Sequence, residues 1–319
     1  MIKKTALVFG ASGQDGTLMC KLLKQEKYKV FAISRGSNFK NHKLVNIKVN
    51  TKKIDVYNQI KIHNLIKNTK CDEIYYFAGQ SSYQDSFKES LLTFKSHNLP
   101  LYYILSSVSK IKKKIKVFNA CSGLIFDVKK KIINENSNLN PNSPYGFSKL
   151  ISYLLVKYFR ENNKIWCMSG IMFNHESPRR SDKFVTQKII KGLKSGKCFS
   201  IGNLESRRDW GHAKDYVKAM WVALQQDKAD DYVISTGTSY SVRDFIEIAA
   251  KSMGNEIVWS GEKENEIGTI NGEVAIKVSK EFYRPYTTGL LVGDPSKIEK
   301  LGWTRQYDIH SLIEDMIKG

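Results

Sequence analysis

Short apolar runs alternate with longer amphipathic stretches along the first 173 residues of the chain. The apolar runs are rich in β-branched and aromatic residues, as buried strands are, and they span residues 4–10, 28–34, 72–78, 115–121 and 164–173. The stretches between them, such as DGTLMCKLLKQE at residues 15–26, have the spacing of helices. This alternation predicts an α/β fold of the Rossmann type, with a doubly wound parallel sheet.

The rhythm changes after about Asn174 to mixed short elements rich in Arg, Asp and Trp. We therefore expect a dinucleotide-binding Rossmann domain over residues 1–173, to which later segments at about 209–238 return. Residues 174–319 are expected to form mainly a smaller, mixed α/β substrate-binding domain over the carboxyl edge of the sheet. The sequence has no internal repeat, low-complexity block or long linker.

A net charge of +20, from 51 Lys and Arg against 31 Asp and Glu, raises nucleic-acid binding as an alternative. Much of the excess is lysine in surface-type runs such as residues 110–117 and 128–133. No recognition helix, RNA-binding signature or zinc finger accompanies it. We interpret the charge as a solvated surface that also attracts a polyanionic small substrate, without a nucleic-acid partner.

The five cysteines are scattered and form no Cys-x-x-Cys pair, which argues against a disulfide framework or a metal site and favours a cytoplasmic location. No apolar run reaches the ~18 residues of a membrane span, so we expect no membrane partner.

The first chemical motif is GASGQDG, residues 10–16, which joins the first strand to the first helix. Gly10, Gly13 and Gly16 have the spacing that permits a tight turn and a close approach of backbone to a pyrophosphate. The whole loop, with Ser12, Gln14 and Asp15, is therefore a candidate dinucleotide site. Asp55 lies in KKIDVYN, after a further strand that we expect between those at 28–34 and 72–78. A carboxylate there is placed to accept from an adenine amino group.

The residues at the end of the second strand can distinguish an NAD site from an NADP site. An acidic residue there would hold a ribose 2′-hydroxyl, whereas arginines would pair with a 2′-phosphate. The chain has Arg35 at this point, with no acidic residue and no second arginine. This position alone leaves both cofactors open.

The catalytic signal is PYGFSK, residues 144–149. Tyr145 and Lys149 are four residues apart and share a helix face, so the Lys149 ammonium is expected to lower the pKa of the phenol. The phenolate would act as general base on a hydroxyl that loses hydride to the cofactor. Ser122, after the strand at 115–121, supplies a hydroxyl that can hydrogen-bond the same alcohol.

Several longer motifs resemble those of the GDP-mannose 4,6-dehydratases, which are extended short-chain dehydrogenases/reductases. They are YYFAGQSS, NPNSPYGFSK, GIMFNHESPRR, FVTQKI, GNLESRRDWGHAKDYVKAMW and YRP, in that order along the chain. The resemblance implies further cofactor contacts at Val56, Phe77, Ala78, Gln80, His175 and Arg180. It implies a GDP-sugar site at Ser81, Asn174, Glu176, Val185, Lys188, Asn203, Arg208 and Arg284, of which Lys188, Arg208 and Arg284 would surround the diphosphate. Arg179 falls in the same segment, and for Trp210, His212 and Asp215 a purely structural role is an equal alternative.

One departure from this family concerns the reaction itself. The family has a sequence close to Ser-Thr-Ser-Glu after the strand at 115–121, whose glutamate removes the C5 proton of the sugar before water leaves. The aligned residues here are Cys121, Ser122, Gly123 and Leu124. Asp127 lies three residues further on, too far along an extended loop to take over the proton transfer.

We therefore expect the enzyme to oxidise C4 of a GDP-linked manno-configured sugar, a mannose or a heptose, to a 4-ketone without dehydration, for a surface polysaccharide. The reduced cofactor would then need exchange or a second small oxidant such as a 2-oxo acid, and this favours NAD, with NADP still open. The alternatives are a dehydratase with another base, a 4-keto GDP-sugar reductase and an idle sugar-nucleotide-binding partner. Because the arginine-rich insertion that resembles a tetramer-building loop is missing after Arg35, we expect a homodimer.

Overall fold

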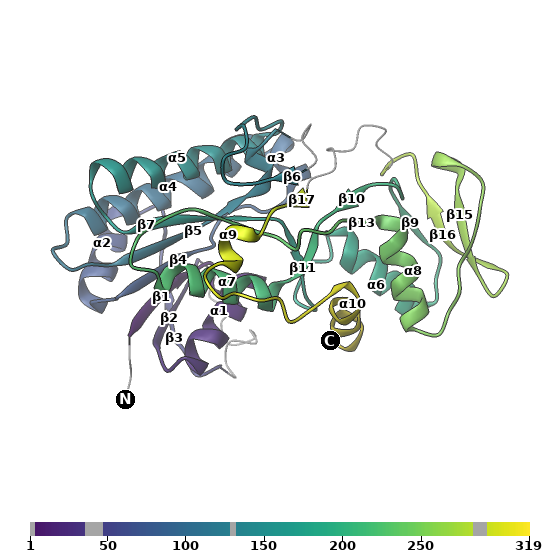
Figure 1. Cartoon of the computed structure of the whole chain (residues 1–319), viewed down its shortest axis with the longest axis horizontal. Coiled ribbons are helices and arrows are strands. Elements are labelled where there is room, and N and C mark those ends of the chain that lie inside the picture. Colours follow the sequence, from purple (N-terminus) through teal and green to yellow (C-terminus); the bar gives the residue numbers. More distant parts are fainter. Residues whose placement is uncertain (1–3, 36–46, 128–131, 283–291) are drawn as a thin grey trace.

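The computed structural model describes residues 4–35, 47–127, 132–282 and 292–319. Its centre is a seven-stranded sheet in the order β12-β7-β5-β4-β1-β2-β3, and all six neighbouring pairs run parallel (Figure 1). The strands are β1 (Thr5–Phe9), β2 (Lys29–Ser34), β3 (Asn50–Lys53), β4 (Glu73–Tyr76), β5 (Lys116–Ser122), β7 (Cys167–Met172) and β12 (Tyr232–Ile234). The Rossmann-type fold is thereby confirmed. Ser122 is the last residue of β5, whereas the sequence placed it just after the strand.

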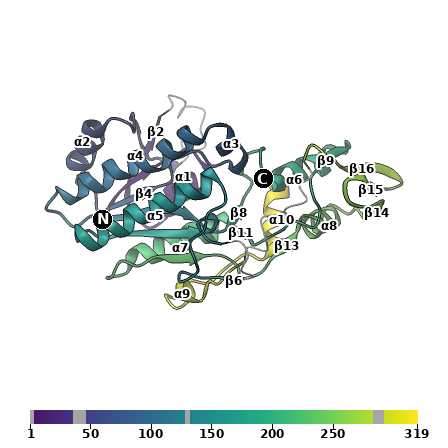
Figure 2. The ribbon, with the colours of Figure 1, turned by 90° about the horizontal axis from the view of Figure 1, so that it is seen from above.

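Helices cover both faces of this sheet (Figures 1 and 2). One face carries α2 (Gln59–Thr69), α4 (Ser90–Ser109) and α5 (Pro144–Asn162), whose apolar side chains pack against Leu7, Ile74 and Val117. The other face carries α1 (Gln14–Gln25), α7 (Ala213–Gln225) and the short α9 (Ser296–Glu299), which pack against Val8, Tyr75 and Phe118. Each helix buries one face because its apolar residues recur every three or four positions. The short α3 (Tyr83–Lys88) packs beside α4 and α5.

A second core lies in the C-terminal part of the chain, to the right in Figure 1. It joins α6 (Val185–Ser195), α8 (Val242–Ser252) and α10 (Ile309–Lys318) to a four-stranded sheet of β14 (Val258–Ser260), β15 (Ile267–Ile270), β16 (Glu273–Val278) and β9 (Phe199–Ile201). Three strand pairs complete the structure: β8 (Asn174–Glu176) with β11 (Trp210–His212), β10 (Arg207–Arg208) with β13 (Tyr240–Ser241), and β6 (Ile132–Ile133) with β17 (Val292–Gly293). Within the described ranges, 3-10 helices span Gly123–Ile125 and Lys263–Asn265. The division of the chain at residue 173 stays a prediction.

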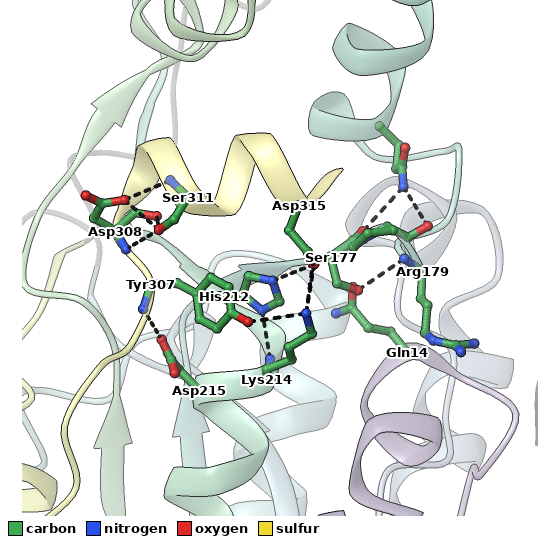
Figure 3. A network of polar contacts seen from close by, with 12 residues as sticks. Gln14, Ser177, Arg179, His212, Lys214, Asp215, Tyr307, Asp308, Ser311 and Asp315 are labelled. Atoms are coloured by element: carbon green, nitrogen blue, oxygen red, sulfur yellow. Dashed lines mark hydrogen bonds and ion pairs between the residues drawn. The ribbon is translucent and has the colours of Figure 1, made fainter. Parts of the chain in front are cut away.

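The segment with Trp210, His212 and Asp215 contacts the C-terminal helix α10 and the residues before it. A structural role for these three residues was one of two alternatives left open by the sequence. His212 contacts Asp315 of α10 at 2.9 Å through Nε2, and its ring lies 3.9 Å from that of Tyr307 (Figure 3). Asp215 accepts the backbone N–H of Tyr307 at 3.0 Å. Trp210 is buried in the second core. In the structure these three residues hold elements together.

In the described part of the chain, no helix is long and apolar enough to cross a membrane. The same residues include no group of three or more His, Cys, Asp or Glu that could hold a metal ion. All five cysteines are free thiols, and Cys198 alone among them is exposed.

Candidate active site

The loop between β1 and α1 lies at the carboxyl edge of the sheet, where the strand order reverses between β1 and β4. Gly10 has φ +77°, and a Cβ there would come within 2.8 Å of the Ala78 nitrogen. A Cβ on Gly16 would overlap the Gly10 carbonyl, whereas one on Gly13 would meet only that carbonyl oxygen, at 3.4 Å. Gly13 caps α1 without a side-chain hydrogen bond, so the first N–H groups of α1 remain available to a ligand. These features fit a pyrophosphate.

Three residues of the predicted cofactor site form one hydrogen-bonded group beneath this loop. Asp15 contacts His175 at 2.9 Å, and Gln14 donates to the His175 carbonyl at 3.0 Å. Ser177 donates to Gln14 at 2.8 Å, which ties α1 to the segment after β8 (Figure 3). Burial alone would raise the pKa of Asp15 and lower that of His175, but their mutual attraction reverses both shifts. The pair is therefore a buried ion pair, and the His175 ring stacks on Tyr216 at 4.7 Å.

The three predicted catalytic side chains come together next to this loop. Ser122 ends β5, and Tyr145 and Lys149 lie one turn apart on α5. Ser143 caps α5 by accepting the Gly146 N–H at 3.0 Å, and Pro144 occupies the first helical turn, where its missing N–H costs nothing. The Tyr145 phenol is hydrogen-bonded to Ser122. The Lys149 ammonium donates to the Ala120 carbonyl at 2.8 Å and lies 5.7 Å from the centre of the Tyr145 ring.

The expected lowering of the Tyr145 pKa by Lys149 is wrong for this structure. Burial raises the pKa of Tyr145 to about 12, and although the Ser122 hydrogen bond opposes the shift, Lys149 is not among its causes. Burial also lowers the pKa of Lys149 to about 8. The sequence showed that the two side chains share a helix face, but not that both would be desolvated there.

The other predicted cofactor residues follow the ends of β2, β3 and β4, at the same edge of the sheet. Arg35 is exposed just after β2, and the Ser12 hydroxyl lies 3.5 Å from that of Ser34. Asp55 accepts the Tyr57 N–H at 3.0 Å, which shapes the turn after β3. The amide oxygen of Gln80 is buried without a hydrogen-bond partner, so it could accept from a ligand. The set is completed by Val56, Phe77 and Ala78.

Glu176 and Arg180 lie where the loop after β8 approaches Tyr145. Glu176 is buried, accepts from Thr186 at 2.7 Å and pairs with Arg180 at 3.1 Å. The Arg180 guanidinium stacks on the Phe184 ring at 3.5 Å, and its charge lowers the pKa of Tyr145. In the structure Glu176 holds Arg180, and its predicted contact with the sugar nucleotide stays a prediction.

The predicted diphosphate residues come from two elements of the C-terminal part. Lys188 on α6 lies over the Phe282 ring at 3.8 Å, and burial lowers its pKa. Arg208 on β10 donates to the Arg207 carbonyl at 2.6 Å, and burial lowers its pKa as well. Arg284 lies outside the described residues. The other predicted substrate residues come from four places. Ser81 lies in the loop after β4, Asn174 begins β8, Val185 begins α6, and Asn203 lies in the turn before β10.

Leu124, the departure found in the sequence, lies in the 3-10 helix after Ser122. Its backbone N–H donates to the Ser122 hydroxyl oxygen at 3.2 Å. Its half-buried side chain packs against an apolar cluster that includes Cys121 and Ile125. Asp127 follows this helix, and its N–H donates to the Asn138 carbonyl at 2.9 Å.

Two buried residues at or near the site were missed by the sequence reasoning. His97 on α4 contacts the Tyr145 ring, and Asp209 accepts four hydrogen bonds, among them one from Gly293 at 3.2 Å. Burial raises the pKa of Asp209 to about 6 against those bonds. A lone histidine in a helix and an aspartate beside two arginines carry no signal that distinguishes them from surface residues.

The family model described as "GDP-mannose 4,6 dehydratase" matches residues 7–316. The chain belongs to this family. A relative from Cricetulus griseus named GDP-mannose 4,6 dehydratase is 34% identical and covers 99% of this chain and 91% of its own length. One of the same name from Vibrio cholerae is 33% identical, with 99% and 93% coverage. The resemblance drawn from the sequence motifs is confirmed, and the chain is a member of the extended short-chain dehydrogenase/reductase enzymes that modify sugar nucleotides.

A solved structure supports the fold of the family member. The dTDP-glucose 4,6-dehydratase of Bacillus anthracis, determined in complex with NAD, superposes with a TM-score of 0.81 over 99% of this chain and 96% of that one. At 17% sequence identity this likeness concerns the fold alone.

Proposed function

We propose that this protein oxidises C4 of a GDP-linked manno-configured sugar to the 4-ketone, with NAD as hydride acceptor, and releases the product without dehydration. The observation that carries the proposal is the assembly of Ser122, Tyr145 and Lys149 beside Leu124, whose side chain is apolar. The first three residues are the machinery for removing hydride from an alcohol. The fourth leaves the neighbouring sugar carbon without a base.

Tyr145 takes the proton of the C4 hydroxyl while the C4 hydride leaves, and Ser122 hydrogen-bonds the same oxygen. An oxidised nicotinamide, when bound, accepts the hydride, and its positive charge lowers the pKa of a phenol beside it. This charge is needed because burial holds the Tyr145 pKa at about 12. Arg180 adds a second cation that acts in the same direction.

Two carboxylates near this site are already engaged in ion pairs. Asp15 pairs with His175, and Glu176 pairs with Arg180 and Thr186. A carboxylate held in this way is a poor base for the C5 proton, since proton abstraction would break its ion pair. Oxidation therefore leaves the cofactor reduced. Turnover requires exchange of that cofactor or a second small oxidant, such as a 2-oxo acid, after the sugar leaves.

The choice of a GDP-sugar rests on the family and on cations in the C-terminal part. Lys188 and Arg208 are half-buried, and burial lowers the pKa of both, so the opposite charge of a bound diphosphate would offset the cost of their desolvation. The choice of NAD over NADP rests on Arg35, a single exposed arginine after β2, where a 2′-phosphate usually meets more than one cation.

The deciding experiment mixes the purified protein with NAD and either GDP-mannose or a GDP-manno-heptose, and follows absorbance near 340 nm and the sugar mass. We expect one equivalent of reduced cofactor per site and a product two mass units lighter, with further turnover when a 2-oxo acid is added. Tyr145→Phe is the matched control and should give neither.

Three other outcomes would each favour an alternative. A product 18 units lighter without lasting reduced cofactor means that another base performs dehydration. Consumption of NADH by a 4-keto GDP-sugar, with no reaction in the forward direction, makes the enzyme a reductase. Binding of GDP-mannose without any absorbance change under all conditions indicates an idle binding partner.

We also propose that the protein is a homodimer joined through the outer face of α4 and α5. These helices pack side by side, and each exposes apolar side chains three, four, seven or eight residues apart, which share one helix face. Leu91 is 62% and Tyr158 57% exposed. The remaining members of the face are Phe94, Tyr102, Phe147 and Leu154. Six large exposed apolar side chains on one pair of helices are uncommon on a monomer, and a second copy would cover them symmetrically.

A further inference from the structure

His97 on α4 has a buried imidazole that contacts the ring of Tyr145, the proposed catalytic base. Its side chain is 2% exposed, and its ring meets the Tyr145 ring edge to face, with the centroids 5.5 Å apart and the planes at 81°. Burial and the nearby Lys149 charge both hold the pKa of His97 well below its usual value, so the ring is neutral at physiological pH.

The two ring nitrogens of His97 face different parts of the site. Nδ1 lies 3.1 Å from the hydroxyl of Ser148, which belongs to the same turn of α5 as Tyr145 and Lys149. The other side of the ring lies against Gly79, where a Cβ would overlap it. Gly79 belongs to the loop after β4, which carries part of the predicted cofactor site.

The contact with Gln80 favours one tautomer of the neutral ring. His97 is hydrogen-bonded to the backbone of Gln80, and the Gln80 N–H is already donated to Ser96 at 3.1 Å. The Gln80 carbonyl is therefore the group that accepts from the imidazole, through the nitrogen nearer Gly79, which is Nε2. With its proton on Nε2, the neutral ring leaves Nδ1 to accept from Ser148 at 3.1 Å. The single proton of that hydroxyl then goes to His97 in place of the Thr93 carbonyl, which lies 3.2 Å from it.

We propose that His97 is a positioning residue that fixes the distance between the catalytic helix α5 and the cofactor loop at Gly79–Gln80. One rigid ring contacts the tyrosine ring, contacts α5 through one nitrogen and contacts the loop through the other. A shift of about 1 Å between a base and its reaction partner can cost about 100-fold in rate, so a link of this kind affects the chemistry directly. The kinetic part of the inference rests on the proposed oxidation, whereas its binding part does not.

The test compares three substitutions at His97. His97→Phe keeps the ring and removes both nitrogens. His97→Gln keeps a donor near the position of Nε2, and His97→Asn keeps a polar group near the position of Nδ1. The control is Asn98→Ala. Asn98 also donates to Ser148, at 3.2 Å, but it donates otherwise to the Phe94 carbonyl within α4 and not to the cofactor loop.

Two quantities are measured for each variant: the NAD dissociation constant by calorimetric titration without sugar, and the single-turnover rate of nicotinamide reduction with saturating GDP-sugar. His97→Phe should weaken NAD binding at least about fivefold, because the Gln80 carbonyl loses its partner, and slow hydride transfer about 10- to 100-fold. The GDP-sugar dissociation constant should not change. His97→Gln should restore NAD affinity and His97→Asn should not, and Asn98→Ala should stay within about threefold of the wild type in rate.

The inference is overturned if His97→Phe binds NAD and transfers hydride within twofold of the wild type and only its melting temperature falls. His97 would then be a core histidine without a role in the site. Should His97→Phe fail to fold, equal NAD affinities of His97→Gln and His97→Asn would overturn it in the same way. If the wild type oxidises no GDP-sugar, the proposed function fails, and the NAD titrations alone decide the role of His97.

Discussion

Leu124 lies two residues after Ser122, and its N–H is donated to the hydroxyl that we propose binds the reacting alcohol. This bond holds the Leu124 backbone at the site and does not depend on the side chain. Gly146 packs against the Leu124 carbonyl so closely that a Cβ on Gly146 would overlap the carbonyl oxygen. A substitution at position 124 therefore changes the chemistry of one side chain with little change in the position of the backbone.

We predict that Leu124→Glu converts the enzyme towards dehydration. A correctly placed general base contributes about 100- to 10,000-fold, so the variant should form a product 18 mass units lighter at least about 100-fold faster than the wild type, with less reduced cofactor accumulating. Loss of the half-buried leucine should cost about 1–2 kcal/mol of unfolding free energy. Mass spectrometry and a denaturant titration measure the two effects. Leu124→Gln, of equal size but without a base, should show only the loss of stability; equal dehydration by both variants would contradict the prediction.

The pH profile of the oxidation follows from two residues. Tyr145 must lose a proton from a pKa of about 12, so its active form increases tenfold per pH unit, whereas Lys149 loses its ammonium above a pKa of about 8. If both the phenolate and the ammonium are required, the rate rises tenfold per unit at low pH and becomes flat at or below about pH 8. Stopped-flow measurement at subsaturating GDP-sugar between pH 6 and 10 records this profile. A rate that does not rise with pH at the acid end of this range would contradict the prediction.

At the scale of elements, different glycines in the loop between β1 and α1 are expected to serve folding and cofactor binding. A Cβ on Gly13 makes only an ordinary contact with the chain, whereas one on Gly16 overlaps the Gly10 carbonyl. Gly13→Ala should therefore fold with a melting temperature close to that of the wild type but lose at least about tenfold in NAD affinity, because the methyl group lies where the pyrophosphate approaches.

Gly16→Ala is the matched variant of this pair. Overpacking between α1 and β1 should cost about 1–3 kcal/mol of stability, which thermal and denaturant unfolding measure. The reverse order, with a stable Gly16→Ala and an unstable Gly13→Ala, would show that the glycines have other roles than those assigned here.

The same loop illustrates what the sequence could predict. Glycine spacing is a local property, so Gly10, Gly13 and Gly16 could be assigned before the structure was known, as could the helix that brings Tyr145 and Lys149 to one face. His97 could not, because its contacts to Tyr145 and Gln80 depend on how α4 packs against α5 and the loop after β4. The error in the Tyr145 pKa has the same origin: proximity to Lys149 was visible in the sequence, and burial of both groups was not.

At the scale of the whole molecule, segments far apart in sequence complete the sheet and its site. β12, near residue 233, adds a seventh strand beside β7, and β8 pairs with β11 across more than thirty residues of chain. The buried sides of α4 and α5 carry His97, Tyr145 and Lys149, and their outer sides form the apolar face proposed for dimer formation. The proposed assembly and the proposed catalysis therefore depend on the same pair of helices.

This leads to the prediction about assembly. Wild-type protein should have twice the 36.5 kDa mass of the chain in light scattering, and Tyr158→Asp, which places a charge within the face, should have the mass of one chain. Val258→Asp is the control, since Val258 is an equally exposed apolar residue on β14, far along the chain and outside the face. Because a dimer stabilises its folded subunits by mass action, the melting temperature should rise with protein concentration for the wild type and the control but not for Tyr158→Asp. A dimer that survives Tyr158→Asp with an unchanged melting temperature would place the interface elsewhere.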